Sequence, residues 1–274
     1  PDVSKKTRLY YYRDEYRVGF HNRFLDVVLG DKSYNLTQLT ENGRHGFGGE
    51  ARVRISGFEV GGFQQRDRLY SSGYKGYATF LNYTFRDSLQ EIGRLGVNFL
   101  NKDEINQSQI YSLTGNYRQY NIARLDFEYA QGSESGQSAY QVLISGSHKY
   151  FSYNAEYLHS SPNYAGSVAN FDKISGGVRV MPVTNLTLSA GYSQNKYNVD
   201  NNIALGAAPI NKTISAGVSY SIPLLNLSVS VSAFQYNWKD ELSVVNYETD
   251  YNQLRSSINY RIRAFNAGVY AEFN

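Results

Sequence analysis

Apolar and polar residues alternate with a period of two along most of this chain. The alternation is clearest at residues 122–129, where one parity is apolar and the other charged: Ala123, Leu125, Phe127 and Tyr129 against Arg124, Asp126 and Glu128. Successive side chains of a strand point to opposite faces, so the segment predicts a strand with one apolar and one hydrated face. The alternation recurs in about sixteen segments of roughly ten residues each, which is typical of a transmembrane β-barrel.

Further strands are predicted where turn residues bound the alternation: 47–56, 91–100, 169–181, 211–222, 252–262 and 264–273. One segment departs from this alternation of apolar and polar residues. Leu227, Val229 and Val231 hold one parity, and then Phe234, Tyr236 and Trp238 take the other. A β-bulge near Ala233 would explain the switch, or the aromatic end faces a headgroup layer or a plug.

Connections between these segments alternate between short and long. Short ones are expected near residues 21–22, 56–57, 120–121, 150, 182–185, 223–226 and 263, and longer ones near 31–45, 67–73, 132–137, 160–168, 197–211 and 239–247. Short turns at one rim and long loops at the other are typical of outer-membrane barrels. This order places both ends of the strand array on the long-loop side. Either a strand is still unassigned, with 33–37 as the candidate, or the chain is part of a larger barrel.

Composition supports a barrel rather than a helical membrane protein. The 274 residues include 26 Tyr and 14 Phe but one Trp, and Tyr suits membrane–water boundaries. No run of about twenty apolar residues is present for a helical span. A soluble β-sandwich or solenoid would also alternate, but its buried face needs mainly Val, Ile, Leu and Phe. Here Tyr, Ala, Thr and Gly are frequent on the apolar parity, which favours a lipid-facing surface.

Other classes of protein are excluded or disfavoured. The absence of cysteine excludes disulfides and thiolate metal sites, and a formal charge of +3 is too mild to indicate nucleic-acid binding. The four histidines, His21, His45, His148 and His159, match no metal-site spacing, although His148 and His159 flank the turn near residue 150 and could approach each other. No nucleophile elbow is present. We therefore predict neither an enzyme nor a cofactor, and a single domain over residues 1–274.

Charged residues on the hydrated parity are the candidate pore lining. They are Arg52, Arg54, Arg86, Arg94, Arg118, Arg124, Asp126, Glu128, Lys173, Arg179, Arg255 and Arg261. One interpretation is structural, with Arg and acids on neighbouring strands forming ladders. The other is a mildly positive pore that favours anions. In that case a positive belt is expected near the short-turn rim, formed by Arg17, Arg86, Arg94, Arg118, Arg124 and Arg261.

Residues 31–45 are the longest predicted connection, and their apolar members suggest that the segment packs on something. It is either an ordinary surface loop or a constriction loop folded into the interior. The same region carries a local resemblance. Leu29-Gly30-Asp31, followed by Tyr34, Leu36, Thr37 and Leu39 and then by Gly43-Arg44 and Gly46 to Gly49, resembles the early barrel region of fimbrial ushers. The resemblance implies that the Leu-Gly-Asp step ends a strand, and that the barrel is a polypeptide-translocation pore.

The sequence thus predicts an all-β fold, a transmembrane antiparallel up-and-down β-barrel of about sixteen strands or a large segment of a bigger one. A barrel of this size encloses an aqueous channel unless it is plugged. We expect a bacterial outer-membrane channel for small polar solutes, including anionic ones if the interior is mildly positive. The alternatives are the wall of an export pore for polypeptide or polysaccharide, and an occluded structural or adhesive barrel. The expected partners are outer-membrane lipid and assembly proteins of the periplasm or outer membrane, not nucleic acid.

Overall fold

The computed structural model describes residues 15–67, 73–87, 90–103, 107–120, 122–242, 247–262 and 265–273. Within these residues the chain forms sixteen strands and two short 3-10 helices. The strands are β1 (Arg17–His21), β2 (Leu25–Asn35), β3 (Asn42–Ile55), β4 (Phe58–Arg66), β5 (Lys75–Asp87), β6 (Gln90–Asp103), β7 (Gln107–Gln119), β8 (Ala123–Gly132), β9 (Ser138–His148), β10 (Phe151–Ser160), β11 (Phe171–Val180), β12 (Leu186–Tyr197), β13 (Pro209–Ile222), β14 (Leu227–Asp240), β15 (Glu248–Ile262) and β16 (Phe265–Phe273). The 3-10 helices are η2 (Ile203–Leu205) and η3 (Pro223–Leu225). No helix in the described part of the chain is long and apolar enough to cross a membrane.

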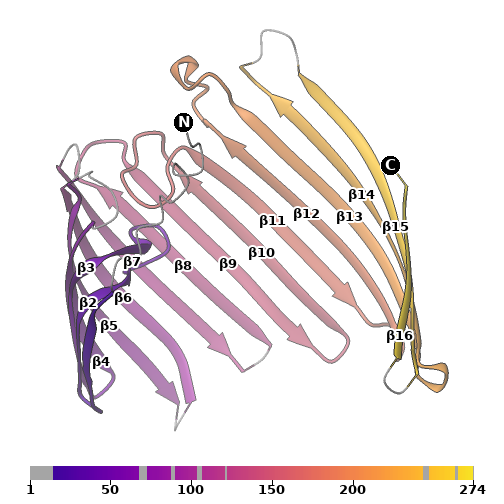
Figure 1. Cartoon of the computed structure of the whole chain (residues 1–274), viewed down its shortest axis with the longest axis horizontal. Coiled ribbons are helices and arrows are strands. Elements are labelled where there is room, and N and C mark those ends of the chain that lie inside the picture. Colours follow the sequence, from indigo (N-terminus) through magenta and orange to yellow (C-terminus); the bar gives the residue numbers. More distant parts are fainter. Residues whose placement is uncertain are drawn as a thin grey trace, which may run out of the picture.

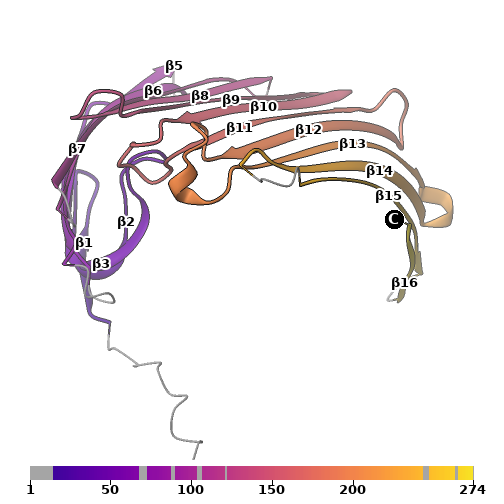
Figure 2. The ribbon, with the colours of Figure 1, turned by 90° about the horizontal axis from the view of Figure 1, so that it is seen from above.

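All sixteen described strands belong to one antiparallel sheet in which each strand pairs with its neighbours in sequence. This confirms the predicted up-and-down topology. Seen from above, the sheet bends into a C-shaped wall (Figure 2). β1 and β16 form its two edges, and in the described residues they do not pair with each other.

The two faces of the wall differ as the alternation predicts. Large apolar side chains stand exposed on the convex face, for example Val97 at 51%, Leu113 at 44% and Ile258 at 49%. The opposite parity, on the concave face, carries the charged and polar residues. Because so many apolar side chains are exposed side by side, the convex face is suited to an apolar surrounding.

Short turns join the strands at one rim and longer connections join them at the other (Figure 1). The shortest turns use left-handed backbone, as at Ser56 and Gly57, whose φ angles are 49° and 88°. The predicted short turns are confirmed, except that residues 121 and 263 lie outside the described residues. β1 begins and β16 ends toward the long-loop rim, as the turn order predicts.

The prediction that residues 31–45 form the longest connection is wrong. β2 continues to Asn35 and β3 begins at Asn42, so the connection is only 36–41, and the candidate strand at 33–37 is the end of β2. The strand also passes through Leu29-Gly30-Asp31, where the usher resemblance implied that it would end. β2 and β3 curl into the concave side of the wall instead (Figure 2).

Two glycines allow this inward curl. Gly30 has a φ of +116°, and a Cβ atom built on it would lie 1.9 Å from the Tyr16 carbonyl oxygen. A Cβ atom on Gly48, its cross-strand partner, would lie 1.9 Å from the Gln64 carbonyl oxygen. Only glycine fits such close backbone approaches, so these positions fix where the strands leave the wall.

The β-bulge predicted near Ala233 is absent from the described strands. β14 keeps an unbroken register with β13 and β15. The parity of β14 never changes, and only the residue types do. Ser228, Ser230 and Ser232 occupy the concave face first, and the aromatic residues that follow occupy the same face. Phe234, Tyr236 and Trp238 therefore face the interior.

Candidate functional site

The candidate site is the interior of the curved wall, where residues 36–41 form an inward loop. Tyr34 and Leu39 are completely buried. They belong to a core on the concave side, completed by Phe63, Ala78, Leu100, Ile110, Ala130, Ala139, Leu158 and Tyr164. Since these residues come from strands β2 to β10 and from the connections, the loop packs on the inner wall. Of the two interpretations of this region, the structure supports the constriction loop.

A carboxylate on the opposite wall anchors the tip of the inward loop. Glu128, on β8, accepts hydrogen bonds from the Leu39 backbone N–H, with both oxygens 3.3 Å from the nitrogen, and from the Thr37 hydroxyl. Glu128 is only 7% exposed. Hydrogen bonds to a buried charged acceptor are among the stronger ones in proteins, so this contact holds the loop across the interior.

The connection between β10 and β11, residues 161–170, supports the inward loop from a second side. The Tyr164 hydroxyl donates to the Leu39 carbonyl oxygen at 3.2 Å, and the Ser167 N–H donates to the same oxygen at 2.8 Å. Burial, with the nearby Glu128, raises the pKa of Tyr164 well above its usual value. Its hydroxyl therefore stays protonated and remains a donor.

A third group of contacts fixes the base of the inward loop. The Tyr74 hydroxyl donates to Glu41, and the Lys102 ammonium lies 3.8 Å from the same carboxylate. Lys102 also donates to the Ala165 carbonyl oxygen at 3.2 Å, so it contacts both inward segments. The two connections form one constriction on the concave side.

Beside the inward loop lies a cavity of about 470 Å³. The loop contributes Leu36, Thr37 and Gln38 to its lining, and the wall contributes side chains from β3 to β9. Wall residues at the cavity include Arg52, Glu59, Asn82, Arg94, Asn98, Asn116, Arg124, Asp126, Glu128 and Gln141. The lining is polar and holds both signs of charge.

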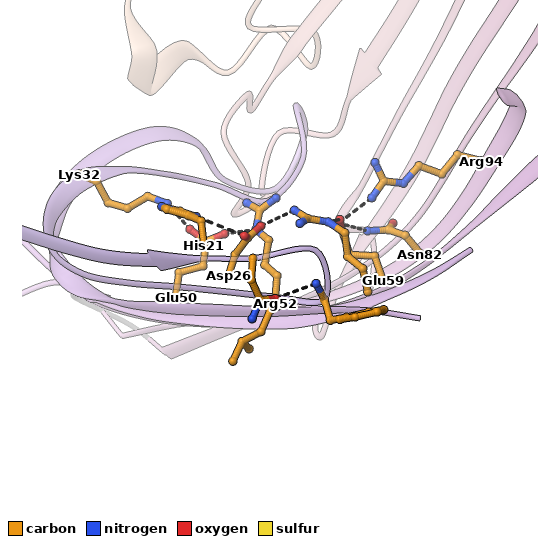
Figure 3. A network of polar contacts seen from close by, with 12 residues as sticks. His21, Asp26, Lys32, Glu50, Arg52, Glu59, Asn82 and Arg94 are labelled. Carbon is orange, nitrogen blue, oxygen red and sulfur yellow. Dashed lines mark hydrogen bonds and ion pairs between the residues drawn. The ribbon is translucent and has the colours of Figure 1, made fainter. Parts of the chain in front are cut away.

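A network of ion pairs crosses the first strands of the wall (Figure 3). Arg54 binds Asp26 at 2.5 Å and Glu59 at 2.9 Å, and Arg94 binds Glu59 at 2.7 Å. Here the ladder interpretation of the charged residues is correct. Each arginine is matched by a carboxylate on its own or a nearby strand.

The same network continues toward the inward loop (Figure 3). Glu50, which is 6% exposed, binds both Lys32 and Arg52. Lys32 lies on β2 just before the loop, so the ladder joins the curled strand to the wall. Because a carboxylate offsets the charge of the cations it binds, paired charges of this kind add little net charge to the interior.

The predicted pore-lining residues all occupy concave positions where their side chains are described. Five of them line the cavity: Arg52, Arg94, Arg124, Asp126 and Glu128. Outside the cavity, Lys173 binds Glu156 at 2.7 Å, and Arg255 lies 3.7 Å from Glu272. The side chain of Arg261 lies outside the described residues.

Three predicted lining arginines, Arg86, Arg118 and Arg179, are exposed and have no carboxylate partner among the described residues. Arg118 stands directly opposite Arg124 in the register of β7 and β8. Arg124 is matched by Asp126 at 2.6 Å, which leaves the charge of Arg118 unmatched. Each of these three arginines lies near the strand end that meets a short turn. Of the predicted positive belt, only Arg86 and Arg118 in the described part of the chain stand exposed and unmatched near the short-turn rim. Arg94 and Arg124 are paired with carboxylates, and Arg17 begins β1 at the strand end away from the short turn. The belt as a whole stays a prediction.

Neutral polar residues at the cavity were not among the predicted lining residues. Asn82, Asn98 and Asn116 share the concave parity of the predicted arginines, and parity alone could have found them. Thr37 and Gln38 could not be found this way, because their position depends on the inward curl of the strands.

The histidine expectation is wrong. His148 pairs with Phe151 beside the turn, whereas His159 pairs with Tyr140 at the other end of the same hairpin. The two histidines are therefore about one strand length apart, at opposite ends of the β9–β10 hairpin. His159 instead binds Asp172 at 2.5 Å on the convex face. No cluster of three potential metal ligands occurs among the described residues.

Comparison with solved structures identifies the fold. OccAB3 of Acinetobacter baumannii matches with a TM-score of 0.50 and 12% identity, covering 92% of this chain and 75% of that chain. OccK10 (OpdN) of Pseudomonas aeruginosa matches with a TM-score of 0.50 and 13% identity, covering 91% and 83%. A BenF-like porin from Pseudomonas fluorescens Pf-5 matches with a TM-score of 0.48 and 16% identity, covering 94% and 78%. The likeness to the first two structures shows the fold, which is that of bacterial outer-membrane β-barrel porins. No known family profile and no curated protein matches the chain.

Proposed function

We propose that this protein is a bacterial outer-membrane channel that passes small polar solutes, with a weak preference for anions. Lipid would cover its convex face, and water would fill its concave side. The proposal includes no catalytic step and no cofactor.

The contrast between the two faces supports a position in the membrane. Val97, Leu113 and Ile258 are among many exposed apolar residues of the convex face. Exposing such a surface to lipid is not unfavourable, because lipid tails are apolar. Exposed to water, the same surface would make the protein associate with other apolar surfaces. The concave face carries the ion-pair network and the polar cavity, which suit water.

The observation that carries the proposal is the inward loop, docked across a polar interior. Residues 36–41 narrow the space without filling it, and a cavity of about 470 Å³ remains beside them. This volume is typical of sites that accept small molecules. A channel with such a constriction selects small solutes and rejects folded or extended polypeptides.

The weak anion preference rests on unmatched cations. Most charged residues of the interior are paired, and a matched pair adds little net potential. Arg118 and Arg179 are exposed and unmatched among the described residues, near the short-turn rim. A few such charges bias ion passage without imposing strict selectivity.

An occluded structural barrel is the second candidate. The matched ion pairs of Arg54 and Arg94 favour it, because a rigid ladder of this kind would also line a closed interior. A polypeptide-export wall is less favoured. Export would require the inward loop to leave its contacts with Glu128 and Tyr164.

Planar-bilayer recordings of the full-length protein in a salt gradient test the proposal. We expect steady single-channel steps and a reversal potential that shows mild anion preference. Liposome swelling with solutes of increasing size should show a sharp size limit. Folded, inserted protein that gives no current would favour the occluded barrel, and cation preference would contradict the role of the unmatched arginines.

A further inference from the structure

An array of aromatic rings lies on the concave face near the long-loop rim, on a part of the wall that the charged cavity does not use. Tyr236 and Tyr251, on neighbouring strands, stack with ring centroids 4.6 Å apart and planes 17° apart. Phe234 continues the array, 6.0 Å from Tyr236 and at 16° to it. Trp238 follows on the same parity of β14. The array therefore presents nearly parallel rings toward the interior.

The outer members of this array remain accessible. The Trp238 side chain is 52% exposed and the Tyr251 side chain is 42% exposed. Trp238 makes no ring contact with another described aromatic residue, so its exposed surface is available to a ligand. Stacked rings hold one another in place, which makes the exposed members a preorganised surface.

The wall on the β12 and β13 side of the array is neutral. From Leu186 to Trp238, the concave positions of β12, β13 and β14 carry no charged side chain. They carry hydroxyl and amide groups instead. Asn211 and Thr249 flank Trp238 in the register, and Thr213 flanks Tyr236. Hydrogen-bonding groups thus flank the rings on this side. Asp240, two residues beyond Trp238 on the same parity, is engaged by the Ala208 and Leu242 backbone N–H groups.

The nearest concave cation is already engaged. The Arg255 guanidinium lies 4.9 Å from the centre of the Phe234 ring and 3.7 Å from the Glu272 carboxylate. An aromatic or aliphatic anion would need a free cation beside the rings, and the described concave residues next to the array include none. This argues for a neutral ligand.

From these contacts we infer that the concave ends of β13, β14 and β15 form a binding site for a neutral sugar. A pyranose ring presents a face of C–H groups, which stacks on an aromatic ring, and an edge of hydroxyls, which pairs with amide and hydroxyl side chains. The stacking partners are Trp238 and Tyr251, and the hydrogen-bonding partners are Asn211, Thr213 and Thr249. This inference deepens the proposed channel function by naming a solute class, but binding itself needs no conduction.

The chain contains one tryptophan, so Trp238 fluorescence reports this site directly. The full-length protein, folded in detergent micelles, is titrated with maltotriose. Saturable quenching or a blue shift of Trp238 emission is expected. Tyr251→Ala should weaken the apparent affinity by roughly five- to tenfold, as expected for the loss of one aromatic partner. Tyr192→Ala, an aromatic change on the convex face of β12, should leave it unchanged.

A second variant, Thr249→Val, keeps the rings and removes one hydroxyl from the site. It replaces Tyr251→Ala in the binding test if that variant does not fold. The inference is overturned if maltotriose produces no saturable change in folded protein, or if Tyr192→Ala and Tyr251→Ala weaken binding equally. Saturable binding of benzoate in place of maltotriose would also overturn it. Binding without any bilayer current would defeat the channel proposal alone, and current without binding would defeat the sugar site alone.

Discussion

Replacing Glu128 by alanine should release the inward loop and widen the interior. Glu128 is the only wall residue seen to bind the tip of the loop within the described residues, through Leu39 N–H and the Thr37 hydroxyl. Alanine removes both acceptors. Because Leu39 is completely buried, its N–H would then be left without a partner as long as the loop stayed docked.

The magnitude follows from these contacts. A hydrogen bond to a charged group contributes about 1.5–3 kcal/mol, so losing this anchor weakens loop docking by about 3 kcal/mol, or roughly a hundredfold in the docking equilibrium. The contacts of Leu39 with Tyr164 and Ser167 remain and oppose complete release. We therefore expect a loop that leaves and returns, rather than one that is permanently displaced.

Single-channel recording measures this directly. Glu128→Ala should show higher mean conductance and more current noise than the unchanged protein. Glu156→Ala is the matched control, since Glu156 is also a concave acid but binds Lys173 and Gln141 instead of the loop. Both variants remove one negative charge. If the two variants gave the same conductance and noise, Glu128 would not hold a constriction, and the reasoning would be refuted.

Three further outcomes are expected: one for the two faces of the wall, one for the unmatched arginines of the concave face, and one for the connection after β14. Leu113→Arg, in the middle of β7 on the convex face, should impair assembly into lipid vesicles, because an arginine facing the middle of the bilayer costs about 2–4 kcal/mol, whereas Ser175→Arg on the concave face should be tolerated; equal folding yields would contradict the face assignment. Arg118→Ala should shift the reversal potential in a salt gradient toward the value for a cation-selective channel. An unchanged reversal potential would show that the Arg118 charge does not affect ion selectivity. The hydrogen bond from Lys196 to Glu241 at 2.8 Å lowers the pKa of Glu241 below its usual 4.5, so its contribution to stability is present above that pH and is lost as the pH falls through the lowered value. The thermal unfolding midpoint should therefore fall less on acidification in Glu241→Gln than in the unchanged protein, and an equal fall would exclude this pair as a contributor.

The sequence predicted the features that depend on strand parity. A single period of two assigned Arg52, Arg124 and Glu128 to the concave face and Leu125 to the convex face, because every strand partner repeats the same alternation. The rim of short turns was predicted for a related reason. Turn residues such as Ser56-Gly57 act locally and need no distant partner.

The constriction could not be predicted in this way, because its contacts join distant parts of the chain. Thr37 and Glu128 are 91 residues apart, and the Tyr164 hydroxyl contacts Leu39 across 125 residues. Alternation also cannot show that Gly30 and Gly48 let β2 and β3 leave the wall. The aromatic residues of β14 illustrate a second limit: alternation alone allows either a β-bulge or an aromatic end on an unchanged face, and only the register with β13 and β15 excludes the bulge.

Cysteine modification during single-channel recording tests the central claim most directly, because the chain has no cysteine of its own. Asn116→Cys places a thiol at the cavity, and Leu113→Cys places one on the convex face of the same strand. A charged, water-soluble methanethiosulfonate reagent should reduce the current of Asn116→Cys in discrete steps and leave that of Leu113→Cys unchanged. Equal modification of both variants, or complete reaction at Asn116→Cys with no change in current, would contradict a water-filled channel lined by the concave face.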